Sequence, residues 1–306
     1  MLTWTIGAGG LIGSAVDARS DTPFSGSPVG WADPVQALAT LTDDLTRFSG
    51  QVRGAPWGIV WAAGAATTST GEAQAMAEAD FFRSFAQAVA DAGLPPDGAV
   101  FVCSSAGGVH AGSPRPPFDE TTPPAPLGSY GRARLAQEQA AAEILGPVLP
   151  VVIGRISNVY GPGQKLDKLQ GLISRLAISA ITREPLNLFV PLSTVRDYVY
   201  VTDVAASVHD WLGWAAARRP SAHVRVLASG EGTSVGQLVR MAQGIAHRKV
   251  PIAMGSHPSS SLQAADLRFI PSVVPDAQPR PGTPMPVGMK LVFDDVRWRL
   301  QHAGVG

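Results

Sequence analysis

Residues 2–13, LTWTIGAGGLIG, join a short apolar strand to a glycine-rich turn. Gly7, Gly10 and Gly13 are spaced by three. One such glycine permits the tight strand-to-helix turn, one lets a pyrophosphate approach the backbone, and one lets the helix pack on the strand. The amides and dipole of the following helix favour phosphate. We therefore expect a Rossmann-type turn that holds a dinucleotide, with a purely structural turn as the alternative. The residues expected to contact the dinucleotide here are Gly7, Gly10, Leu11, Ile12 and Gly13.

The adenosine end of this expected site has an incomplete signature. In Rossmann folds an acidic residue about 20 residues after the glycines meets the ribose at the end of the second strand. Here the expected helix over 11–19 is followed at once by residues 20–23, SDTP, and no second strand is evident. Asp17, Arg19 and Asp33 are the nearby candidates. An arginine would accept a 2′-phosphate, so NAD and NADP both stay open. It also stays open that the adenosine half of the site is degraded.

The rest of the first half alternates apolar strands with helices. Strands are expected at 58–63, 99–103 and 148–155, and helices at 35–48, 73–92 and 130–145. Short apolar strands separated by helices predict an α/β fold: a Rossmann-type, doubly wound parallel sheet with helices on both faces.

The second half is less regular and indicates a smaller C-terminal substrate lobe. Helices are expected at 169–181 and 204–218, an extended piece at 187–191, and Ser- and Pro-rich loops at 256–286. The expected division is a dinucleotide-binding Rossmann domain at 1–165, to which 194–218 returns, and a smaller substrate-binding lobe at 166–193 and 219–306.

Composition narrows the class of protein. The chain has 306 residues, of which 45% are hydrophobic and 16% charged, so wholesale disorder is excluded. Lys and Arg number 24, as do Asp and Glu, which leaves no basic surplus for a nucleic-acid backbone. The one cysteine, Cys103, can form no internal disulfide, and no metal site is expected. Neither a signal-peptide pattern nor a long apolar run is present, so a cytoplasmic protein without a membrane span is expected.

Five further motifs follow the glycine turn along the chain. They are WAAG at 61–64, SSA at 104–106, YGRAR at 130–134, RISNVYGPG at 155–163 and TVRDYVYV at 194–201. Together with residues 7–13 they resemble the extended short-chain dehydrogenase/reductase family, specifically its NAD-dependent epimerase/dehydratase branch. The resemblance implies a nicotinamide cofactor over the sheet and a nucleotide-linked sugar between the lobes. Family members oxidise a sugar hydroxyl to a ketone, and then reduce, epimerise or eliminate.

The resemblance implies a catalytic role for Tyr130. In the family, the tyrosine of a Tyr-x-x-x-Lys motif is the acid/base, and the lysine one helical turn on lowers the pKa of the phenol and holds the nicotinamide ribose. Here Arg134 stands in the place of the lysine. Arginine keeps the charge, but its guanidinium is longer and planar. Either Arg134 replaces the lysine with altered geometry, or the enzyme is slow or redox-inactive. No lysine precedes Lys165, so none close in sequence can substitute.

The third expected catalytic group is a hydroxyl that hydrogen-bonds the reacting oxygen. Ser105 is preferred and Ser104 is second; the alternative is that both satisfy backbone groups at a strand end. The Thr-Asp-Glu signature of sugar 4,6-dehydratases is absent, because residues 106–108 read AGG, which disfavours dehydration. We expect His110 to be structural.

The resemblance also implies binding residues. Beyond the glycine turn, those expected at the cofactor are Ala62, Ala63, Gly64, Tyr130 and Arg134. Those expected at the substrate are Ser105, Asn158 and Arg196. Arg196 would pair with the nucleotide diphosphate through its bidentate guanidinium. A salt bridge to Asp197 or Asp203 is the alternative for this arginine.

Taken together, the sequence favours an NAD- or NADP-dependent epimerase or keto-reductase that acts on a nucleotide-linked sugar by hydride transfer, with Tyr130 moving the proton. The alternative is a family member that binds the cofactor but is catalytically weak or inactive, with a binding or regulatory role. A homodimer is expected by analogy, and neither a nucleic-acid nor a membrane partner is expected.

Overall fold

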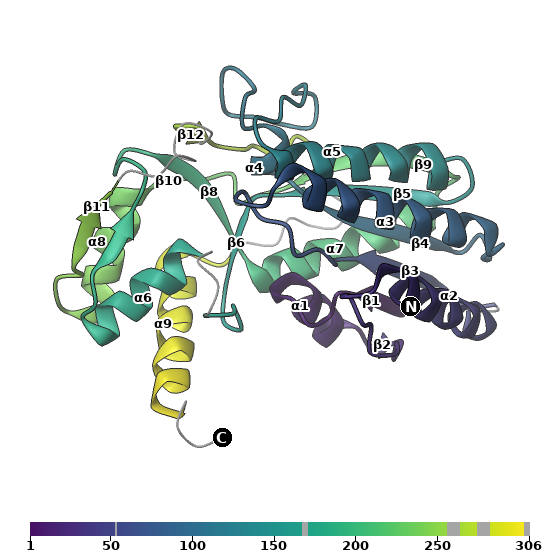
Figure 1. Cartoon of the computed structure of the whole chain (residues 1–306), viewed down its shortest axis with the longest axis horizontal. Coiled ribbons are helices and arrows are strands. Elements are labelled where there is room, and N and C mark those ends of the chain that lie inside the picture. Colours follow the sequence, from purple (N-terminus) through teal and green to yellow (C-terminus); the bar gives the residue numbers. More distant parts are fainter. Residues whose placement is uncertain (53, 167–170, 256–263, 274–281, 303–306) are drawn as a thin grey trace.

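The computed structural model describes residues 1–52, 54–166, 171–255, 264–273 and 282–302. Its centre is a six-stranded parallel sheet with helices on both faces, joined to a smaller lobe (Figure 1). The strand order is β2-β1-β3-β4-β5-β9. This arrangement confirms the expected Rossmann-type α/β fold.

Most elements of the central layer lie where they are expected; the exceptions are the strands at 22–23 and 221–227 and the short helix at 106–109. Its strands are β1 (Leu2–Ile6), β2 (Thr22–Pro23), β3 (Trp57–Trp61), β4 (Gly98–Ser105), β5 (Pro150–Ile156) and β9 (Ser221–Leu227). Its helices are α1 (Leu11–Arg19), α2 (Pro34–Gln51), α3 (Glu72–Asp91), α4 (Ala106–Val109), α5 (Ser129–Ala140), the π-helical turn η1 (Ala141–Leu145) and α7 (Val201–Ala216).

Two apolar layers enclose the sheet, because successive side chains of a strand point to opposite faces. On one face Ile59 of β3 packs in a buried cluster with Phe85 of α3. On the other face the neighbouring Val60 packs with Val16 of α1 and Val204 of α7. Helices α2, α3 and α5 therefore cover one face, and α1 and α7 cover the other (Figure 1).

The side of the sheet beyond β1 is short. The usual Rossmann order places two strands beyond β1. Here only β2 among the described strands lies on that side of β1, and β1 and β2 pair over two residues. From β2 the chain passes through α2 directly to β3, on the opposite side of β1. Where no confident second strand is expected, the structure has the two-residue β2, and α2 occupies the position of a crossover helix.

The smaller lobe has its own buried core, formed mainly by α6, α8 and α9. Its strands are β6 (Asn158–Tyr160), β7 (Leu186–Leu188), β8 (Val195–Tyr200), β10 (Gly232–Ser234), β11 (Ile252–Met254) and β12 (Asp266–Leu267). Its helices are α6 (Leu172–Thr182), α8 (Val235–Ala246) and α9 (Met285–His302). Strand β8 pairs with β6, β10 and β12, so it is the centre of the lobe's main sheet.

The structure divides the chain differently from the expected boundary at residue 219. Residues 221–227 form β9 and pair in parallel with β5 in the central sheet, not in the smaller lobe. Only Val226 and Leu227 of this edge strand are buried, so its sequence lacks the continuous apolar run of a central strand. Within 194–218, α7 packs on the central sheet, whereas β8 belongs to the lobe. Much of the expected loop region 256–286 lies outside the described residues.

A buried ion pair joins α5 to β5 beneath the ends of the strands. Nη2 of Arg155 lies 2.7 Å from Oε2 of Glu138, and both side chains are about 5% exposed. Ser104 donates from Oγ to Oε1 of Glu138 at 2.6 Å. Nη1 of Arg155 lies 3.2 Å from Nε2 of His110. Burial, together with the charge of Arg155, lowers the pKa of His110 to about 4, so a neutral imidazole accepts this hydrogen bond. The network fixes the end of β4 against α5.

We expect Arg155→Met to destabilise the protein by about 3–5 kcal/mol, because it leaves the Glu138 carboxylate buried without its partner. Urea unfolding measures the loss. The control is Arg83→Met, which breaks an exposed pair with Glu143 and should change stability by less than about 1 kcal/mol. Equal small effects of the two substitutions would contradict a structural role for the buried pair.

His110 should make stability depend on pH between about 4 and 6.5. In this range an unfolded histidine binds a proton and the folded one does not, so stability rises with pH. His110→Gln keeps an acceptor for Arg155 but cannot titrate. The difference in unfolding free energy between the wild type and this variant should therefore change by up to roughly 3 kcal/mol across the range. Chemical unfolding at a series of pH values tests this; a constant difference would argue against it.

Candidate active site

The glycine turn between β1 and α1 brings backbone segments into direct contact. Gly7 has a φ of 94°, and a Cβ on it would lie 2.6 Å from the backbone nitrogen of Ala63. A Cβ on Gly13 would lie 2.2 Å from the carbonyl oxygen of Gly7. Neither position accepts a side chain. The structure thus places two of the predicted cofactor segments, the glycine turn and residues 62–64, side by side.

Helix α1 begins at this turn without a capping side chain. Gly10 is its N-cap and makes no side-chain hydrogen bond to the helix. The first-turn amides of a helix lack partners inside the helix and attract anions. The amides of Leu11, Ile12 and Gly13 therefore suit a phosphate, as the sequence predicts.

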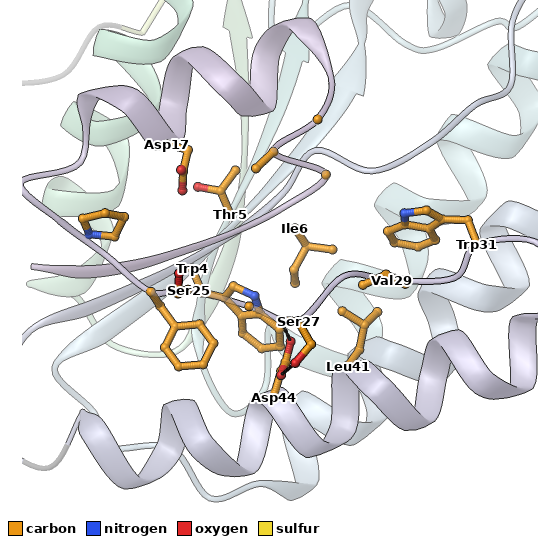
Figure 2. Close-up of a pocket in the computed structure, with 16 residues that line it drawn as sticks. Trp4, Thr5, Ile6, Asp17, Ser25, Ser27, Val29, Trp31, Leu41 and Asp44 are labelled. Atoms are coloured by element: carbon orange, nitrogen blue, oxygen red, sulfur yellow. Dashed lines mark hydrogen bonds between the residues drawn. The ribbon is translucent and has the colours of Figure 1, made fainter.

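A cavity of about 350 Å³ lies beside the glycine turn, between α1 and α2 (Figure 2). The turn, the loop after β2 and α2 all line it. Thr5 is one of its lining residues, and the buried Oγ1 of Thr5 has no hydrogen-bond partner among the described residues. A buried hydroxyl without a partner, in a cavity beside an uncapped helix, fits a polar ligand such as the adenosine part of a dinucleotide.

Of the three charged residues predicted near the adenosine, the structure places Asp17 in the wall of this cavity. Asp33 instead caps α2, where its side chain accepts hydrogen bonds from the amides of Val35 and Gln36. Arg19 lies in the last turn of α1 and is not a lining residue. At the end of β2 the chain continues as Phe24 and Ser25, so no carboxylate stands at the usual ribose position.

Sequence reasoning missed a carboxylate in the cavity wall, that of Asp44 on α2. Asp44 is 1% exposed and accepts hydrogen bonds from the amide and hydroxyl of Ser27, at 2.7 and 2.8 Å (Figure 2). Burial opposes its ionisation, but hydrogen bonds from Arg47 and Ser27 hold its pKa below the usual value. The available signal was its position: Asp44 falls between Leu41 and Leu45 on the apolar face of the helix.

Helix α5 lies against α4 so closely that the Tyr130 ring lies beside Gly108 of α4, next to Ser105. A Cβ on Gly131 would lie 2.1 Å from the carbonyl oxygen of Gly108. A Cβ on Gly108 would in turn lie 3.0 Å from Cε1 of Tyr130 and 3.3 Å from Oγ of Ser105. The tyrosine ring and the serine hydroxyl therefore flank the same glycine. The structure brings together two of the three predicted catalytic side chains.

The third predicted catalytic residue, Arg134, lies one helical turn further along α5. Its Cζ is 5.2 Å from the centroid of the Tyr130 ring. Its Nη1 donates to Oε1 of Gln137 at 2.8 Å. Burial opposes the charge of Arg134, but interactions with Tyr130 and Glu78 raise its pKa above the usual value. The site therefore holds a permanent positive charge beside the phenol.

The two serines have different partners. Oγ of Ser104 is engaged by the buried Glu138 carboxylate, within the network beneath the site. Oγ of Ser105 accepts a hydrogen bond from the amide of Gly108 at 3.1 Å and caps α4. Because that bond uses an oxygen lone pair, the hydroxyl proton of Ser105 remains free to donate. This arrangement favours Ser105 over Ser104 as the donor.

The predicted substrate residues lie where the central sheet meets the lobe. Asn158 on β6 donates from Nδ2 to the carbonyl oxygen of Asp197 at 2.8 Å, so it ties β6 to β8. Nη1 of Arg196 donates to the carbonyl oxygen of Val195 at 2.8 Å. Burial lowers the pKa of Arg196, and its guanidinium forms no ion pair with another described residue.

Both acids proposed as alternative partners of Arg196 are engaged elsewhere. The Asp197 carboxylate accepts hydrogen bonds from Ser157, Ser229 and Gly230. Asp203 accepts from the amide and hydroxyl of Thr283. The half-buried Arg196 guanidinium therefore keeps donors for an anionic ligand.

The model of the NAD dependent epimerase/dehydratase family matches residues 42–224, more than half of the chain. The chain belongs to this family. The match confirms the resemblance seen in the motifs, and it covers Tyr130, Arg134 and Arg196. The family match begins after the glycine turn, so the structural evidence on that turn is independent of the match.

Curated relatives match over a limited region. The dTDP-L-rhamnose 4-epimerase of Burkholderia thailandensis is 33% identical over 125 residues, which is 40% of this chain and 33% of that protein. The dTDP-4-dehydro-6-deoxyglucose reductase of Escherichia coli is 32% identical over 108 residues, or 34% of this chain and 33% of that protein. The matched region thus spans about a third of the length of either relative.

Solved structures match over nearly the whole chain. UDP-glucose 4-epimerase of Thermus thermophilus, in complex with NAD, has a TM-score of 0.77 at 20% identity, covering 97% of this chain and 99% of that one. MoeE5 in complex with UDP-glucose and NAD has a TM-score of 0.74 at 23% identity, covering 98% and 99%. At this identity the likeness shows the fold.

Within the described ranges, none of the helices has the length and apolarity needed to cross a membrane. Likewise, no group of three or more His, Cys, Asp or Glu side chains in those ranges could hold a metal ion.

We expect Gly13→Ala to destabilise the protein by at least about 1–3 kcal/mol, because the added methyl group would overlap the backbone of the glycine turn. Thermal unfolding measures this. Gly9→Ala is the matched control, since a Cβ on Gly9 meets nothing within 4 Å. If both variants unfold like the wild type, Gly13 does not lie in close contact with the backbone of Gly7.

Proposed function

We propose that the chain binds NAD and carries out hydride transfer on a nucleotide-linked sugar, with Tyr130 as the acid/base. One observation carries this: the Tyr130 ring and Oγ of Ser105 flank the same glycine, with the Arg134 guanidinium 5.2 Å from the ring centroid. Membership of the NAD dependent epimerase/dehydratase family supports the same chemistry.

The protein groups have separate roles in this proposal. Tyr130 takes the proton of the sugar hydroxyl and returns it when the ketone is reduced. A cation close to a phenol favours its ionised form, and Arg134 supplies that charge. Ser105 donates its free hydroxyl proton to the reacting oxygen and so holds the sugar in register. When bound, NAD would supply the hydride acceptor and donor in an epimerase, whereas a keto-sugar reductase would need NADH as the hydride donor.

The residues that would hold NAD are those of the amino-terminal turn and its neighbours. The amides of Leu11, Ile12 and Gly13 would take the pyrophosphate, and Thr5 lies in the cavity that suits the adenosine. Ala62 and Ala63 pack on the turn and leave the cofactor close access to β3. We propose NAD over NADP because the family is NAD-dependent.

The substrate class follows from charge and from the relatives. Arg196 has guanidinium donors available for a diphosphate, which arginine binds in bidentate fashion. Residues 106–108 are AGG and offer no acid for elimination of water, so we propose an epimerase or a keto-sugar reductase. Relatives of both kinds are known: one acts as a dTDP-sugar 4-epimerase and another as a dTDP-keto-sugar reductase.

Tyr130→Phe should lower turnover by at least about 100-fold, measured with the nucleotide sugar that the wild type converts, because the substitution removes the group that moves the proton. NAD binding should persist. Thermal stabilisation measures it directly: about 2.7 kcal/mol is expected at a concentration 100 times the dissociation constant. Mass spectrometry of the purified protein should also show a co-purifying dinucleotide.

Other outcomes discriminate between the alternatives. NAD binding without turnover, across a panel of dTDP- and UDP-linked sugars, would favour the binding-only alternative. No stabilisation by NAD or NADP would remove the proposal altogether.

A further inference from the structure

The sequence leaves open how an arginine can serve where the family motif has a lysine. A guanidinium on a long side chain must be held in one place before its charge acts on a neighbouring phenol. In the structure, Arg134 is held by Gln137, which lies one turn further along α5. Nη1 of Arg134 donates to Oε1 of Gln137 at 2.8 Å.

Gln137 is itself fixed on both sides. It is 2% exposed, and its Nε2 donates to the backbone carbonyl oxygen of Glu78 on α3 at 3.3 Å. The amide therefore cannot rotate without losing one of its two bonds. It links the guanidinium on α5 to the backbone of the neighbouring helix.

The same part of α3 holds the loop that follows β3. Oε1 of Glu78 accepts hydrogen bonds from the amides of Ala65 and Ala66, at 2.9 and 2.8 Å. A Cβ on Gly64 would lie 2.6 Å from Nη2 of Arg134 and 3.2 Å from Oε2 of Glu78. Gly64 thus leaves the space that the larger guanidinium occupies.

We propose that Gln137 is a positioning residue, which holds the Arg134 guanidinium beside Tyr130 so that arginine can replace the lysine of the family motif. This inference rests on the proposed role of Tyr130. The groups that face Arg134 are Tyr130 on its own helix, Glu78 from α3 and Cys103 from β4.

Of these groups, Cys103 adds no charge at neutral pH, because burial raises the pKa of its thiol to about 12. The Glu78 carboxylate is the anion that opposes Arg134, and it is occupied by the loop amides. Without Gln137, the guanidinium could turn toward this carboxylate and away from the phenol.

The experiment uses the whole chain with tyrosines labelled at Cζ, whose NMR shift at a fixed neutral pH reports the surroundings of each ring. The sequence has four tyrosines. Tyr130→Phe identifies the signal of Tyr130. The position of this signal needs no cofactor or substrate, so it can be read even if the proposed activity fails.

In Gln137→Met, which keeps the side-chain volume, the Cζ signal of Tyr130 should move from its wild-type position, because the Arg134 guanidinium has turned away from the ring. With substrate and NAD, kcat should fall about tenfold while KM for the sugar stays within about twofold. Gln139→Met is the matched control, because it makes the same change at an exposed position of α5. It should leave the Tyr130 signal and kcat unchanged.

Two further variants decide whether Gln137 acts through the guanidinium. In an Arg134→Lys background the Gln137→Met change should have little added effect on the Tyr130 signal, since the partner guanidinium is gone. Should Gln137→Met fail to fold, Gln137→Asn withdraws the amide by one methylene and should move the Tyr130 signal in the same direction.

An unchanged Tyr130 signal in the folded Gln137 variants, or an equal change in the Arg134→Lys background, would overturn this inference. A changed signal in a protein without turnover would support the inference, and would count against the proposed function.

Discussion

The candidate site depends on backbone-to-backbone approach at glycines. Gly131 lets α5 approach the carbonyl of Gly108, and only at that separation do the Tyr130 ring and the Ser105 hydroxyl flank one point. Gly7 and Gly13 allow the equivalent contact between α1, β1 and the segment after β3. Because backbone has no rotamers to adjust, these contacts fix where the Tyr130 ring and the Ser105 hydroxyl lie more firmly than side-chain packing would.

The charge at the site is maintained differently from the family motif. A lysine is a compact point charge on a flexible stem, whereas an arginine must present a planar fork. The structure meets that requirement with space at Gly64 and an acceptor at Gln137. The buried pair of Glu138 with Arg155 supports the same helix from below, and it connects through Ser104 to the strand that carries Ser105. The rigidity of the site is thus provided largely by residues that do not touch a reacting atom.

Local sequence signals predicted the parts of the site whose geometry is local. The glycine spacing after β1 and the one-turn spacing of Tyr130 and Arg134 are properties of a turn and of a helix, so the order of residues determines them. The role of Gln137 depends on where α3 lies, and the buried Asp44 depends on the loop after β2. Strand β9 escaped prediction although residues 222–226 alternate apolar and polar side chains, because its place in the central sheet depends on pairing with the distant strand β5.

The shortened side of the sheet explains why the amino-terminal signature is incomplete. In the usual order, a second strand presents the acid that meets the adenosine ribose. Here β2 pairs over two residues, and α2 closes the cavity with Leu41 and Asp44. The Asp44 carboxylate is committed to Ser27 and Arg47, so it shapes the loop rather than serving as a free acceptor. The other polar residues in the wall of this cavity include Thr5 and Asp17. The family match begins at residue 42, and so excludes the very segment in which the architecture departs from the usual order.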